Sequence, residues 1–448
     1  MRPGVQATRA EREEARFLAL KSGPVWRALK AEPLAFWLLC IYLGVEYLRP
    51  QHIYPILDAA PIGLLTLGGA LAAVVIGGHG VRHFHAIDGI LLAFFVWVVV
   101  CSLTAFNPGL AWENWTFFVG WAVLYYMVST LLDSPRRLTL FWLAFMLINL
   151  KMSQHGARSF ALRGFTFASY GVTGSPGWFQ NSGEFAMQMA AIVGMGWFFF
   201  LAFKETASVW RVRILLLVFP GTAAMSIIAS SSRGGQLAAA VMVVAGMIAS
   251  RIKPRAIVAV GLVLAVGWLV LPEQQKARFD TMGEDKTSVS RLTYWAEAWE
   301  ATKENPIFGV GYENWIAYYR VNRSASQVEQ VHNTTLQASV ELGFPGLLLF
   351  LSALGITFHM NHVTRKRARD AGPWSSVLRG MATGLDVGLI GMIVAAQFMS
   401  VLFYPMFWCA FGMTTALAET ARKAHGKAAA ERRALARARR ALPVGVRA

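Results

Sequence analysis

The segment IDGILLAFFVWVVVCSLTAF, residues 87–106, decides the fold class of this chain. Asp88 is its only charged side chain, and the remainder of the segment is almost wholly apolar. A helix of roughly 20 apolar residues crosses the hydrocarbon core of a bilayer, which is about 30 Å thick. A second segment of the same kind, SGEFAMQMAAIVGMGWFFFLAF at residues 182–203, also holds one charged side chain. Both segments therefore predict helices that cross a membrane.

The composition of the whole chain agrees with this prediction. Of the 448 residues, 55% are apolar and 15% are charged, whereas a soluble domain carries about 25% charged residues. These values exclude an ordinary water-soluble enzyme, a disordered chain and a small disulfide scaffold. The three cysteines lie in apolar runs without CxxC spacing, so we expect buried thiols and neither a zinc site nor a disulfide framework.

The hydrophobic pattern predicts an all-α polytopic membrane protein with about 12 transmembrane helices. The predicted spans are 34–48, 61–77, 87–106, 112–132, 138–151, 182–203, 211–229, 235–250, 255–271, 336–358, 380–400 and 402–418. In this plan a tail at 1–33 is followed by nine spans at 34–271, a loop at 272–335, three spans at 336–418 and a second tail at 419–448.

The distribution of lysine and arginine predicts which side of the membrane each connecting segment faces. With the N-terminus in the cytoplasm, the inner segments hold 30 of the 42 basic residues and the outer segments hold 12. Cytoplasmic loops carry an excess of Lys and Arg, so both basic tails are predicted to be cytoplasmic. The net charge of +17 is then expected to bind anionic lipid, and a nucleic-acid partner is not expected. The first 33 residues show no convincing cleavage site and are expected to be a retained tail.

Two predicted outer loops are longer than a simple turn, and long ordered loops are usually functional. The loop at 152–181 is rich in glycine and aromatic residues. In the loop at 272–335, Ser290 is expected to cap a short amphipathic helix that starts at Arg291. The segment YENWIAYYR, residues 312–320, predicts a second short helix at the membrane surface.

His332 is the candidate general base. It precedes Asn333, which can cap the helix leading into the span at 336–358. The imidazole would then lie at the positive end of that helix, whose field disfavours protonation. A neutral imidazole can accept a proton at neutral pH. The open alternative is a histidine that only caps the helix or lies at the membrane interface.

Arg233 and Arg291 are the candidate anion-binding residues. Arg233 lies in IIASSSRGGQLAA (227–239), where hydroxyls, amides and a guanidinium can converge on one anion. Arg291 at a helix N-terminus would also fit a bound anion. The alternatives are contact with lipid headgroups for Arg233 and a surface ion pair with Glu297 or Asp285 for Arg291.

A further set of residues is expected to support these three side chains. Glu341 lies inside one predicted span and Glu184 at the start of another, and both acids are expected to orient the arginines. Ser232 and Asn333 are expected to support the site from the adjoining turns. The aromatic residues of the outer loops form an interfacial belt or, alternatively, stack on sugars. The candidate substrate contacts are Arg163, Trp178, Trp295, Trp299 and Tyr312.

Metal ions and cofactors are not predicted. His79, His83 and His85 could bind a metal, but the predicted topology puts them on the cytoplasmic side. Glu284 and Asp285 form an acidic pair that is isolated in the sequence. The sequence holds no P-loop, no GxGxxG followed by an acidic residue, no GxSxG and no HExxH, so it offers no nucleotide site.

Four motifs resemble the O-antigen ligase and polymerase superfamily over about residues 180–360. They are SSRGG (231–235), RLTYWAEAW (291–299), NPIFGVGYENW (305–315) and VHNTTLQASVELGFPGLLLF (331–350). Two further segments are similar to a subgroup known as exosortase-associated O-glycosylation ligases. These segments are YLRPQHIYP (47–55) and RGFTFASYG (163–171).

The resemblance implies a GT-C-like glycosyltransferase in the inner membrane of a bacterium. It implies transfer of a glycan from a polyprenyl diphosphate carrier to an acceptor hydroxyl on the periplasmic face, by a metal-independent inverting displacement. The essential histidine of the family falls on His332, and its phosphate-contacting arginines fall on Arg233 and Arg291. The acceptor is left open between a lipid, a glycan and a protein.

Two other functions stay open at this point. A polymerase that extends one carrier-linked glycan with another would share the fold and the chemistry. A transporter of lipid-linked sugars would place its polar groups near the bilayer midplane. The candidate residues of this chain are instead predicted to cluster at one face of the membrane.

Overall fold

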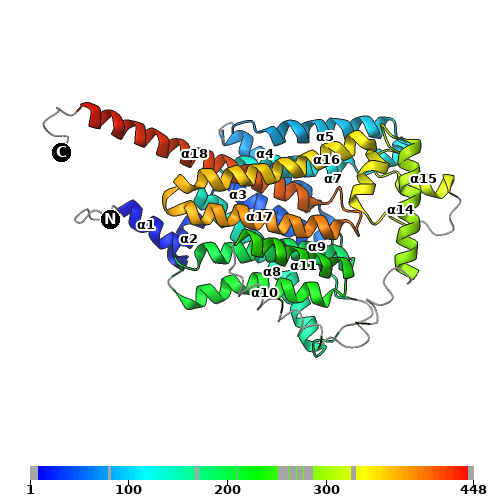
Figure 1. The fold of residues 1–448 in the computed structure, drawn as a ribbon, viewed down its shortest axis with the longest axis horizontal. Coiled ribbons are helices and arrows are strands. Elements are labelled where there is room, and N and C mark those ends of the chain that lie inside the picture. The colour runs from blue at the N-terminus through cyan, green and yellow to red at the C-terminus, as the bar shows by residue number, and fades with distance from the viewer. Residues whose placement is uncertain are drawn as a thin grey trace.

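The fold was analysed in a computed structural model, which describes residues 9–78, 82–166, 171–207, 209–250, 286–323 and 329–441, together with positions 261, 269 and 276. Within these ranges the chain forms helices and connecting loops, and no strand occurs in them. The long helices lie side by side in one bundle (Figure 1). The helices α1 and α18 reach one end of this bundle, whereas α14 and α15 lie at the opposite end. The all-α prediction is therefore confirmed.

The described α-helices are α1 (Arg9–Leu18), α2 (Ser22–Lys30), α3 (Leu34–Leu48), α4 (Ile62–Ile76), α5 (Ala86–Leu103), α6 (Pro108–Glu113), α7 (Trp115–Leu131), α8 (Pro135–Leu162), α9 (Ser182–Phe203), α10 (Trp210–Ala229), α11 (Arg233–Ala249), α14 (Lys286–Glu304), α15 (Trp315–Asn322), α16 (Thr334–Arg367), α17 (Ser375–Ala396) and α18 (Pro405–Ala441). The short 3-10 helices are η1 (Pro50–His52), η2 (Pro55–Ala59), η3 (Ala368–Asp370) and η4 (Gly372–Trp374).

The predicted spans agree in position with these helices. Each one coincides with a described helix except 255–271, of which the structure describes positions 261 and 269 alone. Among the described residues, five helices could cross a membrane by length and composition, and they are α5, α9, α10, the α16 helix continued to Asp370, and the α17 helix begun at Gly372. The number is six if α2 and α3, which are bent by 105°, count as one span. The chain is thus a multi-pass membrane protein, and the total of 12 spans stays a prediction.

The helix α8 is longer than predicted and shortens the first outer loop. The predicted span ended at residue 151, but α8 continues to Leu162 because its polar final turns pack inside the bundle. Ser153 Oγ lies 2.9 Å from Thr222 Oγ1 of α10, and Ser226 Oγ donates to the Ser153 carbonyl at 2.7 Å. Gly156 permits this contact, since a Cβ there would lie 2.3 Å from Ser226 Oγ. The predicted loop boundary at 152 was therefore wrong.

The two predicted tails also carry helices. The first tail contains α1 and α2, and Phe17 of α1 is buried against Trp374 with ring centroids 5.7 Å apart. The indole of Trp374 donates a hydrogen bond to Glu14. At the other end of the chain, the predicted span at 402–418 and much of the second tail form the single helix α18. The tails thus continue the helical fold at this end of the bundle.

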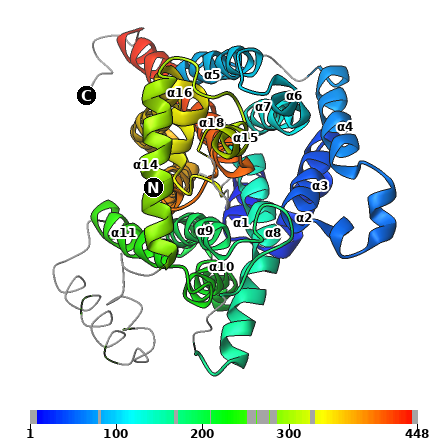
Figure 2. The same cartoon turned by 90° about the vertical axis from the view of Figure 1, so that its right-hand side faces the viewer.

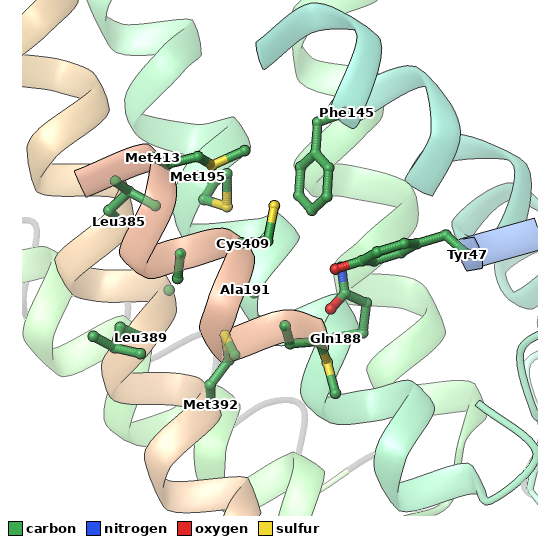
Figure 3. A pocket seen from close by; sticks show the side chains of 13 residues that line it. Tyr47, Phe145, Gln188, Ala191, Met195, Leu385, Leu389, Met392, Cys409 and Met413 are labelled. Atoms are coloured by element: carbon green, nitrogen blue, oxygen red, sulfur yellow. The ribbon is translucent and has the colours of Figure 1, made fainter. Parts of the chain in front are cut away.

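Close backbone contact between α9 and α17 forms the centre of the bundle. A Cβ on Gly194 of α9 would lie 2.5 Å from the Gly388 nitrogen of α17. Small residues let membrane helices approach in this way. Methionine side chains and Cys409 surround a small cavity beside this contact, with Gln188 at its polar edge (Figure 3). Methionine fills irregular gaps in apolar cores, so we interpret this cavity as part of the packing.

Candidate functional site

A break in α16 shapes the candidate site. Gly343 interrupts this helix with φ 67° and ψ −178°, a conformation that essentially only glycine adopts. A Cβ at this position would also lie 2.0 Å from the Ile307 carbonyl oxygen. In a regular helix the Glu341 carbonyl would accept from the N–H of residue 345, but Pro345 has none. The break therefore leaves helix carbonyls free to bind another segment.

The segment 305–315 binds to these free carbonyls. The Val310 N–H donates to the Val340 carbonyl at 2.7 Å, and the Gly311 N–H donates to the Glu341 carbonyl at 3.1 Å. Gly309 must be small, because a Cβ there would lie 2.5 Å from the carbonyl carbon of Glu341. Gly309 of NPIFGVGYENW and Gly343 of ELGFPG are thus explained by one backbone contact.

The side chain of Glu341 is held by the same segment. It is 2% exposed, and its Oε1 accepts from the Trp315 N–H at 3.4 Å while its Oε2 accepts from Gln337 Nε2 at 3.3 Å. Burial raises the pKa of the neighbouring Glu313 above its usual value. The described hydrogen bonds of the Glu341 carboxylate come from the Trp315 backbone and the Gln337 side chain, which are both neutral groups. These contacts do not show the expected pairing with an arginine.

Replacing Gly343 with alanine is expected to destabilise the fold around the break. The backbone strain alone amounts to about 1–3 kcal/mol, and the added Cβ collides with the Ile307 carbonyl. The matched control is Gly355→Ala in the same helix, where no atom lies within 4 Å of an added Cβ. Thermal unfolding of the purified variants measures the difference. Equal melting temperatures for the two variants would contradict this explanation of the motif.

The segment 397–404, between α17 and α18, connects the parts of the site. The His332 N–H donates to Ser400 Oγ at 2.9 Å. Thr334 Oγ1 donates to the Met399 carbonyl at 2.8 Å, and the Leu402 N–H donates to Gln337 Oε1 at 3.2 Å. The sequence interpretation missed this segment because the predicted spans at 380–400 and 402–418 left one residue between them. The available signal was the polar pair Gln397 and Ser400 ahead of Pro405.

The same segment also contacts the beginnings of α9 and α11. A Cβ on Gly183 of α9 would lie 1.7 Å from Met399 Cε, and a Cβ on Gly234 of α11 would lie 2.8 Å from Phe398 Cδ2. Tyr404 donates its hydroxyl hydrogen to Glu184 Oε1 at 2.9 Å. The N-terminal ends of α9, α11 and α16 therefore meet around residues 397–404. The described contacts of Glu184 are also to neutral groups, namely Tyr404 and the backbone of Asn181.

His332 lies directly before the N-terminus of α16, as predicted. Asn333 caps that helix, since its Oδ1 accepts from the Leu336 N–H at 3.0 Å. Burial lowers the pKa of His332, and the nearby positive charge of Arg291 lowers it further. A hydrogen bond to Glu329, with 3.2 Å between His332 Nε2 and Glu329 Oε2, acts in the opposite direction. The net effect favours a neutral imidazole.

Arg291 is close to His332, but its position in the helix differs from the prediction. The helix α14 begins at Lys286, so Ser290 lies within it and does not cap it. Arg291 therefore lies beyond the first turn, and the argument that placed it at a helix N-terminus was wrong. The helix lies across the end of the bundle (Figure 2), and the positive charge of Arg291 acts on the pKa of His332.

Arg233 is the first residue of α11, and the turn before it has the tight form expected for small residues. Ser232 caps the helix, since its Oγ accepts from the Gly235 N–H at 3.2 Å. Ser231 adopts a left-handed conformation with φ 51°. Gly235 allows contact with α9, because a Cβ there would lie 2.4 Å from Ala186 Cβ. Arg233 thus adjoins the residues that pack on segment 397–404.

The amphipathic helix predicted to start at Arg291 forms part of α14, and some of its apolar side chains face the bundle. Trp295 packs against Phe398 with ring centroids 6.3 Å apart, and its indole N–H is buried without a hydrogen-bond partner. Trp299 packs against Phe344 with centroids 6.0 Å apart and is 44% exposed. Leu292 is 55% exposed. Trp295 therefore contacts segment 397–404 and Trp299 contacts the residue after the break in α16, and both stay candidates for substrate contact.

The remaining candidate contacts divide between the core and the surface. Tyr312 is 2% exposed and packs against Phe403 with centroids 4.6 Å apart, a position that does not fit the expected sugar contact. Trp178 is half-buried, and its centroid lies 4.8 Å from that of Tyr404. Arg163 is exposed directly after α8. Trp178 and Tyr312 both contact the rings of segment 397–404, and of these two Trp178 is the more exposed.

The histidines considered as metal ligands lie away from this site. His83 and His85 precede α5, and His85 Nε2 lies 3.4 Å from Glu419 Oε2 of α18. This contact is at the end of the bundle that carries α1, opposite α14 (Figure 1). His79 and the pair Glu284 and Asp285 lie outside the described residues.

The fold and the site define a multi-pass helical membrane protein with a polar site at one end of its bundle. Residues 221–351 match the family described as O-Antigen ligase, and residues 27–161 match a family of unknown function (DUF5935). A stretch of 117 residues is 32% identical to the Exopolysaccharide production protein ExoQ of Rhizobium meliloti (strain 1021). It covers 23% of this chain and 26% of that protein.

These similarities identify the family of the region that carries the site. Residues 221–351 belong to the O-antigen ligase/polymerase superfamily, as the four motifs predicted. The matched region contains Arg233, Arg291, His332 and Glu341. The aligned stretch spans about a quarter of the curated relative. The similarity to the exosortase-associated subgroup stays a prediction.

Proposed function

We propose that this chain is a membrane glycosyltransferase that joins a glycan from a polyprenyl diphosphate carrier to an acceptor hydroxyl. The observation that carries the proposal is that His332, a part-buried side chain, lies within the influence of the positive charge of Arg291. The imidazole is suited to accept a proton, and the guanidinium is suited to bind a diphosphate. The membership of residues 221–351 in the O-antigen ligase/polymerase superfamily supports the same reaction class.

In the proposed reaction, the acceptor oxygen attacks the anomeric carbon as the bond from that carbon to the diphosphate breaks. His332 takes the hydroxyl proton. If its Nε2–H donates to Glu329 Oε2, at 3.2 Å, the lone pair for this proton is on Nδ1. Arg233 and Arg291 stabilise the negative charge that grows on the diphosphate, each by about 2–4 kcal/mol. This direct displacement inverts the anomeric centre and uses no metal ion.

The proposed reaction takes place on the periplasmic face of a bacterial inner membrane. Support comes from the charge distribution, since 30 of the 42 basic residues fall in predicted inner segments. The positions of α14 and α15, opposite the bundle end reached by α1 and α18, agree with this orientation (Figure 1). Membrane lipids and the lipid-linked glycan are then the proposed partners.

A reconstituted transfer assay tests the proposal. The purified chain in liposomes is given a polyprenyl-diphosphate glycan together with a lipid, a glycan or a protein acceptor, and the products are identified by mass spectrometry. Transfer with an inverted anomeric centre, in the presence of a metal chelator, is the expected result. Absence of glycan transfer to every acceptor, with a folded protein, would overturn the proposal.

A polymerase is the second candidate function. The similarity to the Exopolysaccharide production protein ExoQ favours it, because this printed name concerns the production of a polysaccharide. In the same assay a polymerase would lengthen the carrier-linked glycan in the absence of any other acceptor. A ladder of products on the carrier would therefore assign polymerisation, whereas a single transfer to another molecule would assign ligation.

The acid limb of the pH–rate profile is expected to follow the pKa of His332. Glu329 raises this pKa, so Glu329→Gln should lower it and move the acid limb of kcat/KM to lower pH. Activity is lost as the pH falls through the pKa of a general base, which sets the sign of this shift. Profiles of the wild type and the variant, measured in the transfer assay, provide the comparison. An acid limb that stays in place or moves to higher pH would argue against His332 as the base.

A further inference from the structure

A second cavity, of about 430 Å³, lies on the side of the bundle formed by α3, α4 and α7. Its lining includes Glu46 and Arg49 at the end of α3, Gln51 and Asp58 in the following connection, and Phe117 and Trp121 of α7. The connection between α3 and α4 lies at the outer edge of the bundle (Figure 2). This volume is within the range of about 300–1,000 Å³ that is usual for small-molecule sites.

The cavity lies at the same end of the bundle as the candidate site. Phe106, between α5 and α6, donates its N–H to the Val310 carbonyl at 2.9 Å. The segment that leads into α7 therefore contacts the segment bound to the break in α16. The matched region of the O-antigen ligase family begins at residue 221, so the cavity lies outside it.

Glu46 presents one carboxylate oxygen that is not used within the protein. Its Oε1 accepts from Arg49 Nη2 at 2.8 Å and from Trp178 Nε1 at 2.5 Å. Its Oε2 has no hydrogen bond from a described residue. Gly63, at the start of α4, leaves space on that side, since a Cβ there would lie 3.7 Å from this Oε2. Arg49 and Trp178 thus hold the carboxylate in place while Oε2 stays free to accept.

Two other polar groups among the lining residues are also without partners. Gln51 Oε1 and Trp121 Nε1 are buried, and neither has a hydrogen-bond partner within the part of the chain that the structure describes. Buried polar atoms are nearly always hydrogen-bonded in native proteins, so such atoms indicate a place where a ligand can bind. One is an acceptor and the other is a donor. A hydroxyl group, which both donates and accepts, is the ligand group that satisfies this combination.

The charge of the cavity selects between classes of ligand. Glu46 and Asp58 carry two negative charges, and Arg49 carries one positive charge that is paired with Glu46 at 2.8 Å. The lining is therefore net negative and disfavours a diphosphate. The indole of Trp121 and the ring of Phe117 supply apolar surface, on which the C–H face of a sugar ring can pack. A neutral saccharide fits both features.

Trp178 connects this cavity to the candidate site. Its Nε1 donates to Glu46 in the cavity, and its ring lies 4.8 Å, centroid to centroid, from that of Tyr404. Tyr404 in turn donates to Glu184 at 2.9 Å. Contacting side chains thus connect the cavity to segment 397–404, which also accepts a hydrogen bond from the backbone N–H of His332.

We propose that this cavity is a saccharide-binding subsite for neutral sugar rings that lie away from the reacting bond. The inference rests on the proposed glycosyl transfer, because that reaction requires a glycan at this end of the bundle. The sugar rings belong to the glycan of the donor or to that of a saccharide acceptor, and the two sources share the chemistry recognised here. Glu46, Gln51 and Trp121 bind their hydroxyls, and Phe117 and Trp121 pack against their C–H faces.

Direct binding tests the subsite without depending on catalysis. The protein is placed in phosphatidylcholine nanodiscs free of glycoside detergent and titrated with neutral trisaccharides of glucose, galactose, mannose or N-acetylglucosamine. Saturation-transfer NMR follows binding. Gly63→Val narrows the cavity beside Glu46, and Glu46→Gln removes the charge while keeping the shape. Gly68→Val in α4 is the control, because no atom lies within 4 Å of an added Cβ there.

At least one trisaccharide is expected to bind the wild type and Gly68→Val equally, and to bind Gly63→Val and Glu46→Gln roughly tenfold more weakly. Excess inorganic pyrophosphate should not displace it. Absence of saccharide binding to the wild type overturns the inference, and so does equal binding to Gly63→Val. Thermal unfolding checks that both cavity variants are folded.

The transfer assay separates this inference from the proposed function. Gly63→Val should raise KM for the substrate that supplies the bound sugar rings and leave kcat unchanged, so the affected substrate identifies the source. Saccharide binding without glycan transfer by the wild type would overturn the proposed function and support the subsite. Glycan transfer by the wild type with binding unaffected by Gly63→Val would overturn the subsite and support the function.

Discussion

Replacing His332 with alanine is expected to lower the rate of glycan transfer by about 10²–10⁴-fold, the usual contribution of a general base. The structure gives the physical reason, since burial and the charge of Arg291 lower the pKa of this imidazole and keep it ready to accept a proton. The loss should appear in kcat, because the proton moves in the transition state. Rates from the reconstituted transfer assay measure it.

The fold should survive this substitution. His332 contacts segment 397–404 through its backbone N–H, which donates to Ser400 Oγ at 2.9 Å, and alanine keeps that N–H. A matched control is His359→Ala, an exposed position near the other end of α16. This control should transfer glycan at the wild-type rate. Wild-type transfer by His332→Ala itself would remove the imidazole from the mechanism.

Most of the helices could be predicted because the length of each apolar segment can be read directly from the local sequence. The predicted span 182–203 has the same bounds as α9, and the span 34–48 has the same bounds as α3. The cap formed by Asn333 was also predictable, since it depends on residues adjacent in the chain. Local patterns of this kind need no knowledge of what packs against the helix.

The errors occur where contacts between distant segments decide the structure. The final turns of α8 are polar, and their place in the bundle depends on Thr222 and Ser226 of α10. The position of Arg291 within α14 depends on where that helix begins. Serine often caps helices, but Ser290 lies inside α14. Segment 397–404 acquires its role from partners on three other helices, which no local pattern reveals.

The candidate site shows the same division. Its residue types were predictable, because a histidine, arginines and glutamates are rare near predicted membrane spans and therefore conspicuous. The partners of the glutamates were not predictable, since Glu341 is bound by Gln337 and the backbone of Trp315. Glu184 lies in the first turn of α9 and Glu341 inside α16, and the described hydrogen bonds of both come from neutral groups.

The second large effect is expected at the two arginines. Replacing Arg233 or Arg291 with alanine should lower kcat by about 10²–10³-fold, as the loss of one charge-stabilising donor does in other enzymes. Lysine at either position should restore part of this rate, because it keeps the positive charge but cannot make the bidentate hydrogen bonds of a guanidinium group. Arg379→Lys, an exposed position on α17 at the opposite end of the bundle, is the control and should be unaffected.

The pH dependence should distinguish the two arginines from each other. The charge of Arg291 lowers the pKa of His332, so Arg291→Ala should raise that pKa and move the acid limb of kcat/KM to higher pH. The defect of this variant should therefore deepen as the pH falls. Among the described residues, Arg233 has no resolved effect on the pKa of His332, so Arg233→Ala should reduce the rate by a similar factor across the pH range. Parallel profiles for the two alanine variants would mean that Arg291 and the imidazole do not share one site, and the proposed mechanism would then lose its basis.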